Sequence, residues 1–413
     1  MRFRCYYRML AALGFALVLT ACAGAPAARR QTVLTYAFPD DPTNTAVATA
    51  LISAYMSSNP QFRIEAQPIP ASDYAQQLLD RLDRNAPDLF FAADPQVPTL
   101  IKRNALLDVS PLLPAVARLA PTDFQPVPLS VWRRGAALYG LPADVVPHVL
   151  FYNRDLFDAA GLAYPVPGWT WNDWLTAAKQ LSTPGGQAPR YGTALMPWSA
   201  MVWGNGGELL SADGKHTLLD RPEAAAGIQF AAAMVNVHHV APPPPLAGGP
   251  DPIELFKQQR VAMLPAPSSM MTSLLEAKLP FRWGIAPLPT GPVPANPLSV
   301  AGLAVSTRSA NKEAALAFAS WAVGPEGNKA KAHLLPFAAP ALTAAGARPA
   351  EVPGAEAIAQ ALPHGRTLPQ VEQWPAIADL VNQALIPVWQ GQMTAAAAYA
   401  QVAPKIDALL AAG

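Results

Sequence analysis

Apolar residues follow two different spacings along the first part of the chain. A run rich in β-branched and aromatic residues at 32–36 is typical of a strand, whereas residues 46–58 carry apolar side chains at helical spacing until Pro60. The pattern predicts a strand at 32–36, a helix at 46–58, an extended segment at 62–69, a helix at 73–84 and a strand at 88–92. The alternation of strands and helices indicates a mostly parallel sheet with helices on both faces.

Further helices are predicted at 171–179, 311–322 and over most of 371–410. Thr170 and Asp173 have the spacing of a capping box, which would start the first of these helices. Trp171 and Trp174 lie three residues apart on it, and we expect them to pack in the core. Proline and glycine cluster at 241–252, an expected exposed loop, and at 287–297, which we expect to lead into a crossing between two lobes.

The amino terminus has the features of an export signal. Arg2, Arg4 and Arg8 precede an apolar run at 9–20 that is too short for a permanent transmembrane helix. The run ends in Leu-Thr-Ala-Cys, which resembles the bacterial lipobox and implies that Cys22 carries a lipid. Residues 1–22 are thus the expected signal peptide and 23–31 a tether. The alternative is an ordinary secreted protein in which Cys22 is incidental.

Composition narrows the possible functions. The chain is 51% hydrophobic, which is enough for a sizeable core. Its 413 residues are too many for one ordinary domain. Its formal net charge is only +1, so nucleic acid is not an expected partner. The two cysteines, Cys5 and Cys22, both lie in the export segment, which leaves the body of the chain without a disulfide, a cysteine nucleophile or a cysteine metal site.

Four sequence blocks resemble the family 1 extracellular solute-binding proteins of ABC importers, the group that contains the maltose-binding protein. They are Ala-Pro-Asp-Leu-Phe at 86–90; Leu-Tyr-Gly-Leu-Pro at 138–142 with Leu-Phe-Tyr-Asn-Arg-Asp-Leu-Phe at 150–157 and Ala-Gly-Leu at 160–162; Trp-Thr-Trp-Asn-Asp-Trp at 169–174 with Asn-Gly-Gly at 205–207; and Trp-Gly-Ile-Ala-Pro-Leu-Pro at 283–289. One departure is Pro-Ala-Pro-Ser-Ser at 265–269, where the family has a glycine-rich run with an aromatic residue.

The resemblance implies an α/β fold of the class II periplasmic-binding-protein type, in which a ligand cleft lies between two lobes joined by several hinge crossings. It places lobe 1 at 32–142 plus 297–337 and lobe 2 at 146–290 plus 338–413, with crossings near 142–146, 296–302 and 335–340. Hinge closure would remove water from a small polar ligand. The implied partners are a sugar, an oligosaccharide or a polyol derivative and the permease subunits. The expected receptor is a monomer, lipid-anchored on the outer side of the cell membrane.

A sugar site needs polar groups for hydroxyls and aromatic rings for apolar faces. Candidates follow the carboxyl ends of predicted strands, lie at the crossings, or match the family's aromatic contacts. Arg366 would matter mainly for a phosphate or carboxylate ligand. The candidate residues are Phe38, Asp40, Phe91, Asp94, Asp144, Trp198, Trp203, Ser269, Gly302, Arg366 and Trp374. The alternatives are core packing for the aromatic residues and cap or turn roles for Asp94 and Asp144.

An enzyme is the second hypothesis, in the form of a surface-anchored carbohydrate-cleaving protein. Glycoside hydrolysis requires two facing carboxylates, and Asp40 with Asp94 is the pair to measure. The six histidines lack the spacing of a zinc hydrolase, and no nucleophile elbow or phosphate loop occurs in the sequence. We therefore expect no catalytic residue, no cofactor and no metal site, and a receptor for a metal or a peptide is disfavoured.

Overall fold

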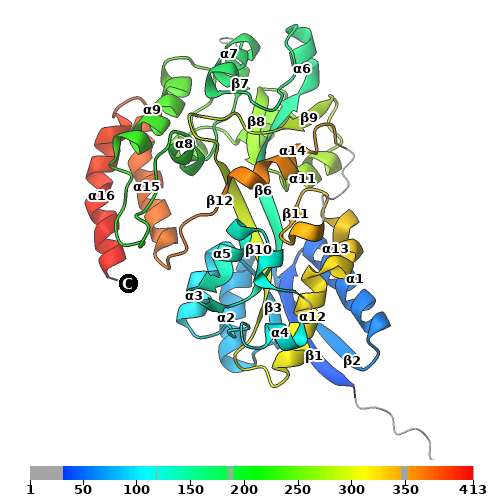
Figure 1. Cartoon of the computed structure of the whole chain (residues 1–413). Helices are drawn as coiled ribbons and strands as arrows, with labels where there is room; N and C mark the ends of the chain where they lie inside the picture. Colours follow the sequence, from blue (N-terminus) through cyan, green and yellow to red (C-terminus); the bar gives the residue numbers. More distant parts are fainter. Residues whose placement is uncertain (1–30, 118, 184, 186–188, 346–351, 413) are drawn as a thin grey trace, which may run out of the picture.

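Two lobes share one continuous sheet in the computed structural model of the chain (Figure 1). The structure describes residues 31–117, 119–183, 185, 189–345 and 352–412. The predicted signal peptide, Cys22 and the tether up to residue 30 therefore lie outside the described residues. In the described part of the chain, none of the helices combines the length and the apolar character that crossing a membrane would need.

Lobe 1 contains the amino-terminal strands and helices together with two later helices. Its elements are β1 (Thr32–Asp40), α1 (Pro42–Ser58), β2 (Phe62–Pro70), α2 (Tyr74–Arg84), β3 (Leu89–Ala93), α3 (Val97–Lys102), α4 (Leu113–Val116), α5 (Pro126–Trp132), β4 (Arg133–Arg134), β5 (Ala137–Leu138), α12 (Lys312–Val323) and α13 (Pro325–Lys331). The elements predicted between 32 and 92 are all present, with boundaries shifted by up to four residues.

Lobe 2 contains the middle of the chain and its carboxyl-terminal helices. Its elements are α6 (Arg154–Ala159), α7 (Trp171–Leu181), β7 (Tyr191–Thr193), α8 (Trp198–Gly204), α9 (Pro222–Asn236), α10 (Pro252–Lys257), β8 (Val261–Pro267), α11 (Met270–Glu276), β9 (Trp283–Ala286), α14 (Ala357–Ala361), α15 (Trp374–Trp389) and α16 (Ala395–Ala411). The predicted capping box is confirmed, since Thr170 accepts from the N–H of Asp173 at 3.2 Å and Asp173 accepts from that of Thr170 at 2.8 Å. Trp171 and Trp174 are buried, as predicted.

Long strands run from one lobe into the other. They are β6 (Leu141–Asn153) and β10 (Asn296–Val305), and the short β11 (Ala339–Pro340) and β12 (Gly365–Arg366) pair with β6 and β10 respectively. The main path of the sheet is β2-β1-β3-β10-β6-β8-β7. Strands β2, β1 and β3 are parallel, but β10 is antiparallel to both β3 and β6. The sheet is therefore mixed rather than mostly parallel, because the returning strand β10 runs opposite to β6.

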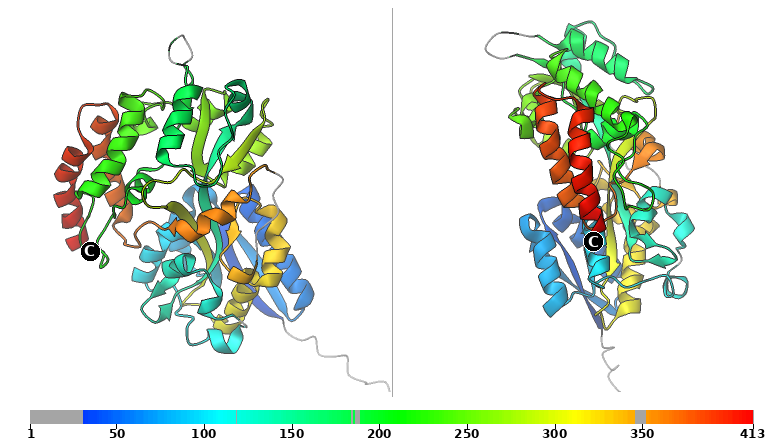
Figure 2. Two further views of the ribbon diagram at one scale, coloured as in Figure 1. Left: turned by 45° about the horizontal axis from the view of Figure 1, so that its top comes forward. Right: turned by 90° about the vertical axis from the view of Figure 1, so that its left-hand side faces the viewer.

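Each lobe has its own hydrophobic core. Lobe 1 packs α1, α2 and α12 against its sheet, and the fully buried Trp132 and Phe90 belong to this core. In lobe 2 the paired helices α15 and α16 pack on α9, and they form the outer edge of the molecule (Figures 1 and 2). A third cluster lies around Val149, Phe151 and Phe337, and Val47 of α1 packs against both this cluster and the lobe 1 core. Only a few strands join the lobes, so these strands are the part of the fold that can bend.

Candidate functional site

A cavity of about 280 Å³ lies where the two lobes meet. Its lobe 1 wall comes from β1, β3 and the first turns of α1, and its other wall comes from α11 and the segment before β11. The lining includes Tyr36, Thr43, Asn44, Phe91, Asp144, Ser269, Thr272, Lys331 and Phe337. Three of the residues predicted from sequence, Phe91, Asp144 and Ser269, are therefore brought to one cavity.

The charged part of this cavity is an ion pair between Lys331 and Asp144. The Lys331 ammonium lies 2.9 Å from a carboxylate oxygen of Asp144, and the two side chains are 2% and 14% exposed. Asp144 sits on β6 opposite Pro340 of β11, so the pair joins the end of α13 to two of the crossing strands. Because both charged groups are nearly shielded from water, removing one of them would leave the other as a buried charge without its ion-pair partner.

Aromatic rings form part of the cavity wall. Tyr36 is buried, and this burial, together with the Asp144 charge, raises the pKa of its hydroxyl, which therefore stays protonated as a donor. Phe91 is held edge-on to Tyr74, whose hydroxyl donates to the Phe91 carbonyl at 2.6 Å. Rings with nearby hydroxyls and a carboxylate are what the apolar faces and the hydroxyl rim of a sugar require.

Helix starts place the remaining polar groups. Asp41 caps α1 by accepting from the N–H of Asn44 at 2.9 Å, and it also holds the Asn44 side-chain amide at 2.7 Å. On the opposite wall Ser269 directly precedes α11 and Thr272 lies in its first turn. The adjacent Ser268 donates to the Phe337 carbonyl at 2.6 Å, which ties this turn to the third crossing.

Asp94 opens a single 3₁₀ turn, η2 (Asp94–Gln96), directly after β3. It is 5% exposed, and burial raises the pKa of its carboxyl to about 7, although N–H groups of Val300 and of Asp94 itself donate to it. A carboxyl with this pKa is partly protonated near neutrality and can both donate and accept hydrogen bonds. Asp94 is not among the residues that line the interlobe cavity.

Trp198 and Trp374 come together in lobe 2. Their ring centroids are 6.1 Å apart with planes tilted by 34°, and both rings pack against the lobe 2 core. Two residues before Trp374, Glu372 accepts a 2.7 Å hydrogen bond from the ammonium of Lys102 at the end of α3. This contact joins lobe 2 to lobe 1 at the carboxyl-terminal end of α3, the helix that follows η2.

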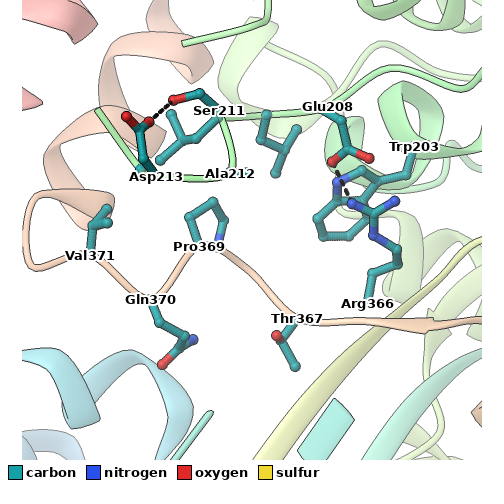
Figure 3. A pocket seen from close by; sticks show the side chains of 13 residues that line it. Trp203, Glu208, Ser211, Ala212, Asp213, Arg366, Thr367, Pro369, Gln370 and Val371 are labelled. Atoms are coloured by element: carbon teal, nitrogen blue, oxygen red, sulfur yellow. Dashed lines mark hydrogen bonds and ion pairs between the residues drawn. The ribbon is translucent and has the colours of Figure 1, made fainter. Parts of the chain in front are cut away.

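Trp203 and Arg366 line a second cavity, the strap groove, of about 370 Å³. Its walls are α8 at Trp203, the loop 208–214 and the strap, which we define as residues 366–371 (Figure 3). The Arg366 guanidinium lies 5.2 Å from the Trp203 ring centroid and forms an ion pair with Glu208. Because Glu208 already neutralises Arg366, the groove lacks the excess positive charge that an anionic ligand would need.

The other predicted residues occupy structural positions. Phe38 is 3% exposed in the lobe 1 core, and Asp40 lies at the surface, where it accepts from the Thr45 hydroxyl at 3.1 Å. Gly302 lies in β10 at a register shift, and a Cβ there would come within 2.5 Å of the Trp132 ring. Tight packing thus accounts for glycine at this position.

The lining residues that the sequence did not predict include Thr43, Asn44 and Lys331. Asn44 and Thr43 follow the first strand, so the position that suggested Asp40 could have suggested them as well. Lys331 lies in the polar sequence Pro-Glu-Gly-Asn-Lys-Ala-Lys, where nothing distinguishes it from a solvated lysine. Only the packing of α13 against α1 and α12, together with the contact to Asp144, makes it a buried charge.

The candidate residues offer little support for glycoside cleavage or for metal binding. Asp40 is exposed and Asp94 is buried, so the two carboxyls proposed for glycoside cleavage differ sharply in environment. Within the described ranges, no group of three or more histidine, cysteine and acidic side chains is arranged to hold a metal ion.

Residues 40–329 match the family described as bacterial extracellular solute-binding protein. The chain belongs to this family. The resemblance drawn from the four sequence blocks is confirmed, and so is the prediction that the protein binds a solute rather than transforming it. The alternative of a carbohydrate-cleaving enzyme gains no support.

Individual relatives agree with this assignment. A lipoprotein of Streptomyces antibioticus, uncharacterised and encoded 5′ to oleD, is 28% identical over 328 residues, which are 75% of this chain and 70% of that protein. A solved ABC substrate-binding protein of Listeria monocytogenes in complex with cycloalternan has a TM-score of 0.78 at 24% identity, covering 92% of this chain and 99% of its own. A cyclic α-maltosyl-1,6-maltose binding protein of Arthrobacter globiformis has a TM-score of 0.79 at 21% identity, covering 93% and 100%. The two solved structures share the fold of this solute-binding protein, and the predicted two-lobed α/β class is confirmed.

Proposed function

We propose that this solute-binding protein captures a neutral carbohydrate between its lobes and delivers it to the permease of an ABC importer. The observation that carries the proposal is the interlobe cavity, which combines the rings of Tyr36, Phe91 and Phe337 with the hydroxyls of Ser269 and Thr272 and the carboxylate of Asp144. Walls drawn from both sides of the crossings allow closure to desolvate the ligand. The cycloalternan complex of the Listeria protein and the name of the Arthrobacter protein, a cyclic α-maltosyl-1,6-maltose binding protein, support the same ligand class.

The strands that connect the two lobes allow the lobes to close on a ligand. Lobe 1 (32–142 plus 297–337) and lobe 2 (146–290 plus 338–413) are joined through β6, β10 and β11, so a small bend in these strands changes the width of the cleft. A ligand that contacts both walls binds the closed form better and shifts the population toward it. The permease then distinguishes the loaded receptor from the empty one by the distance between the lobes.

Binding is tested by titrating the purified protein with saccharides and polyols, including phosphorylated and acidic forms, and following the melting temperature. A neutral saccharide should raise it and should be recovered chemically unchanged after incubation. A protein that responds to no saccharide, or only to charged ones, contradicts the proposed ligand class. Cleavage of the saccharide would revive the enzyme hypothesis.

The location and assembly state are also proposals. We infer that the protein is a monomer, exported and held on the outer side of the cell membrane by a lipid on Cys22, on the basis of the lipobox-like sequence and the lipoprotein relative. Cys22→Ala should move the protein from the membrane fraction to the soluble exported fraction, whereas Cys5→Ala should not. Equal membrane retention of both variants contradicts the anchor, and a dimer in light scattering contradicts the monomer.

A further inference from the structure

The lining of the interlobe cavity carries one charge of each sign. Among the described residues that line it, Asp144 is the only acidic one and Lys331 is the only basic one. The other polar side chains are hydroxyls and one amide, from Tyr36, Thr43, Asn44, Ser269 and Thr272. Tyr36 adds no charge, because burial raises the pKa of its hydroxyl and keeps it protonated. The formal charge of the lining is therefore zero.

The fold fixes both ends of the Lys331–Asp144 ion pair. Lys331 is the last residue of α13, which packs against α1 and α12 within lobe 1 (Figure 1). Asp144 lies in β6, where it is paired with Ala301 of β10 and with Pro340 of β11. Neither end belongs to α11, which supplies the opposite wall of the cavity. The two charges therefore stay paired when that wall moves with lobe 2.

A charged ligand would gain little from this pair. The two charged groups are 2.9 Å apart and their side chains are only 2% and 14% exposed, so each already has its counter-charge close by and little contact with water. A charge on the ligand would lose its own water on closure, and it would either break the pair or stay unpaired. Both outcomes are costly in a nearly dry site. A hydroxyl group avoids this cost, since it donates and accepts hydrogen bonds without carrying a charge.

We propose that the Lys331–Asp144 pair determines the charge selectivity of the receptor, so that the intact pair selects neutral saccharides and the loss of either charge favours a ligand that replaces it. This inference rests on the proposed carbohydrate function and names the residues that exclude charged sugars. Without the ammonium of Lys331, the Asp144 carboxylate favours a cationic amino sugar. Without the charge of Asp144, the Lys331 ammonium favours an anionic uronate.

The test compares three charge forms of the same sugar in each protein at about pH 6, where an amino sugar is cationic and a uronate is anionic. Calorimetric titrations use glucose with glucosamine and glucuronate, galactose with galactosamine and galacturonate, and cellobiose with the glucosamine dimer and cellobiouronate. The variants are Lys331→Met, Asp144→Asn and the double variant. Lys329→Met is the matched control, because Lys329 is an exposed lysine of the same helix and does not line the cavity.

The two single variants should change selectivity in opposite directions. In the wild type, a neutral sugar should bind about tenfold or more tightly than its charged forms. Lys331→Met should raise the affinity ratio of amino sugar to neutral sugar by about tenfold or more, and Asp144→Asn should do the same for the uronate. The double variant should again favour the neutral sugar, and Lys329→Met should stay within about twofold of the wild type throughout.

A pair with only a structural role gives a different result. It would weaken all three charge forms equally in both single variants, and such unchanged ratios overturn the proposal while the carbohydrate function stands. Each single variant decides by itself if circular dichroism shows that the other has not folded. The wild type gives a readout that needs no variant, since charged forms that bind within about twofold of the neutral sugar also overturn the proposal. A wild type that binds none of the neutral sugars overturns both the proposal and the carbohydrate function.

Discussion

The side-chain amide of Asn296 makes two hydrogen bonds to the backbone of His148, accepting from its N–H at 3.0 Å and donating to its carbonyl at 2.8 Å. It continues the β6–β10 ladder beyond Pro147, a residue that has no N–H to donate. Because both strands cross between the lobes, the Asn296 side chain joins the two crossing strands at a point where no backbone hydrogen bond can form.

We expect Asn296→Ala to lower the free energy of unfolding by about 2–3 kcal/mol, because it removes both partners of partly buried backbone groups. Urea unfolding at pH 7 measures the change. The control is Asn311→Ala, which removes one exposed 3.3 Å bond to the Val33 carbonyl and should cost less than about 0.5 kcal/mol. Equal losses in the two variants would show that the Asn296 amide has no special place in the hinge.

Lys331→Met should destabilise the protein by about 3–5 kcal/mol, because it removes the ammonium that faces Asp144 at 2.9 Å in a nearly dry environment. The double variant Lys331→Met/Asp144→Leu should recover much of that loss, since neither charge then remains buried. Urea unfolding of the wild type, the two single variants and the double variant forms a complete cycle. A double variant as unstable as the sum of the single ones would mean that the two charges do not interact.

The pH dependence of stability should report on Asp94. An unfolded aspartate loses its proton near pH 3.8, whereas folded Asp94 keeps it up to about pH 7. The folded state therefore binds more protons between these values, and the stability contributed by Asp94 is complete below pH 3.8 and is lost as the pH rises through 7. Urea unfolding from pH 4 to 8 should show a smaller decline in Asp94→Asn than in the wild type, by up to about 1.4 kcal/mol per pH unit. Parallel curves would contradict the raised pKa.

His148 supplies the opposite trend and serves as the control. Burial lowers its pKa to about 4 from the ordinary 6.5, even though the Pro297 carbonyl lies 3.2 Å from its Nδ1. The unfolded state binds more protons between pH 4 and 6.5, so this stability is present above pH 6.5 and is lost as the pH falls through 4. His148→Gln should remove that loss and leave the Asp94 decline visible on its own.

The Lys102–Glu372 contact should restrict the distance between the lobes. Its side chains are 60% and 37% exposed, so Glu372→Gln should change the free energy of unfolding by less than about 1 kcal/mol. Spin labels on the two lobes should nevertheless show a broader distance distribution in this variant at low salt. At about 1 M salt, where the Debye length is about 3 Å, the wild type should broaden to match it. A wild-type distribution that ignores salt would argue against the contact as a restraint.

Local sequence rules located the elements from β1 to β3, the helix α12 and the start of α7. Val47, Leu51 and Tyr55 fixed the helical face of α1, and Thr170 with Asp173 fixed the start of α7, because these features depend on residues three or four apart. The direction of β10 was not accessible in this way. Its pairing with β3 and β6 joins residues more than a hundred positions apart in the chain, so no local pattern could show that the sheet is mixed.

The candidate site likewise contains features that the sequence predicted and features that depend on tertiary packing. The sequence by itself determined the family, the order of the elements from β1 to β3 and three residues of the interlobe cavity. Strand ends follow from local patterns, and the crossings follow from the family resemblance. Only the tertiary structure decided that Lys331 is a buried partner of Asp144, that Phe38 is a core residue and that Arg366 is neutralised by Glu208. Burial and ion pairing depend on which distant segments pack together, and that is settled only when the whole chain has folded.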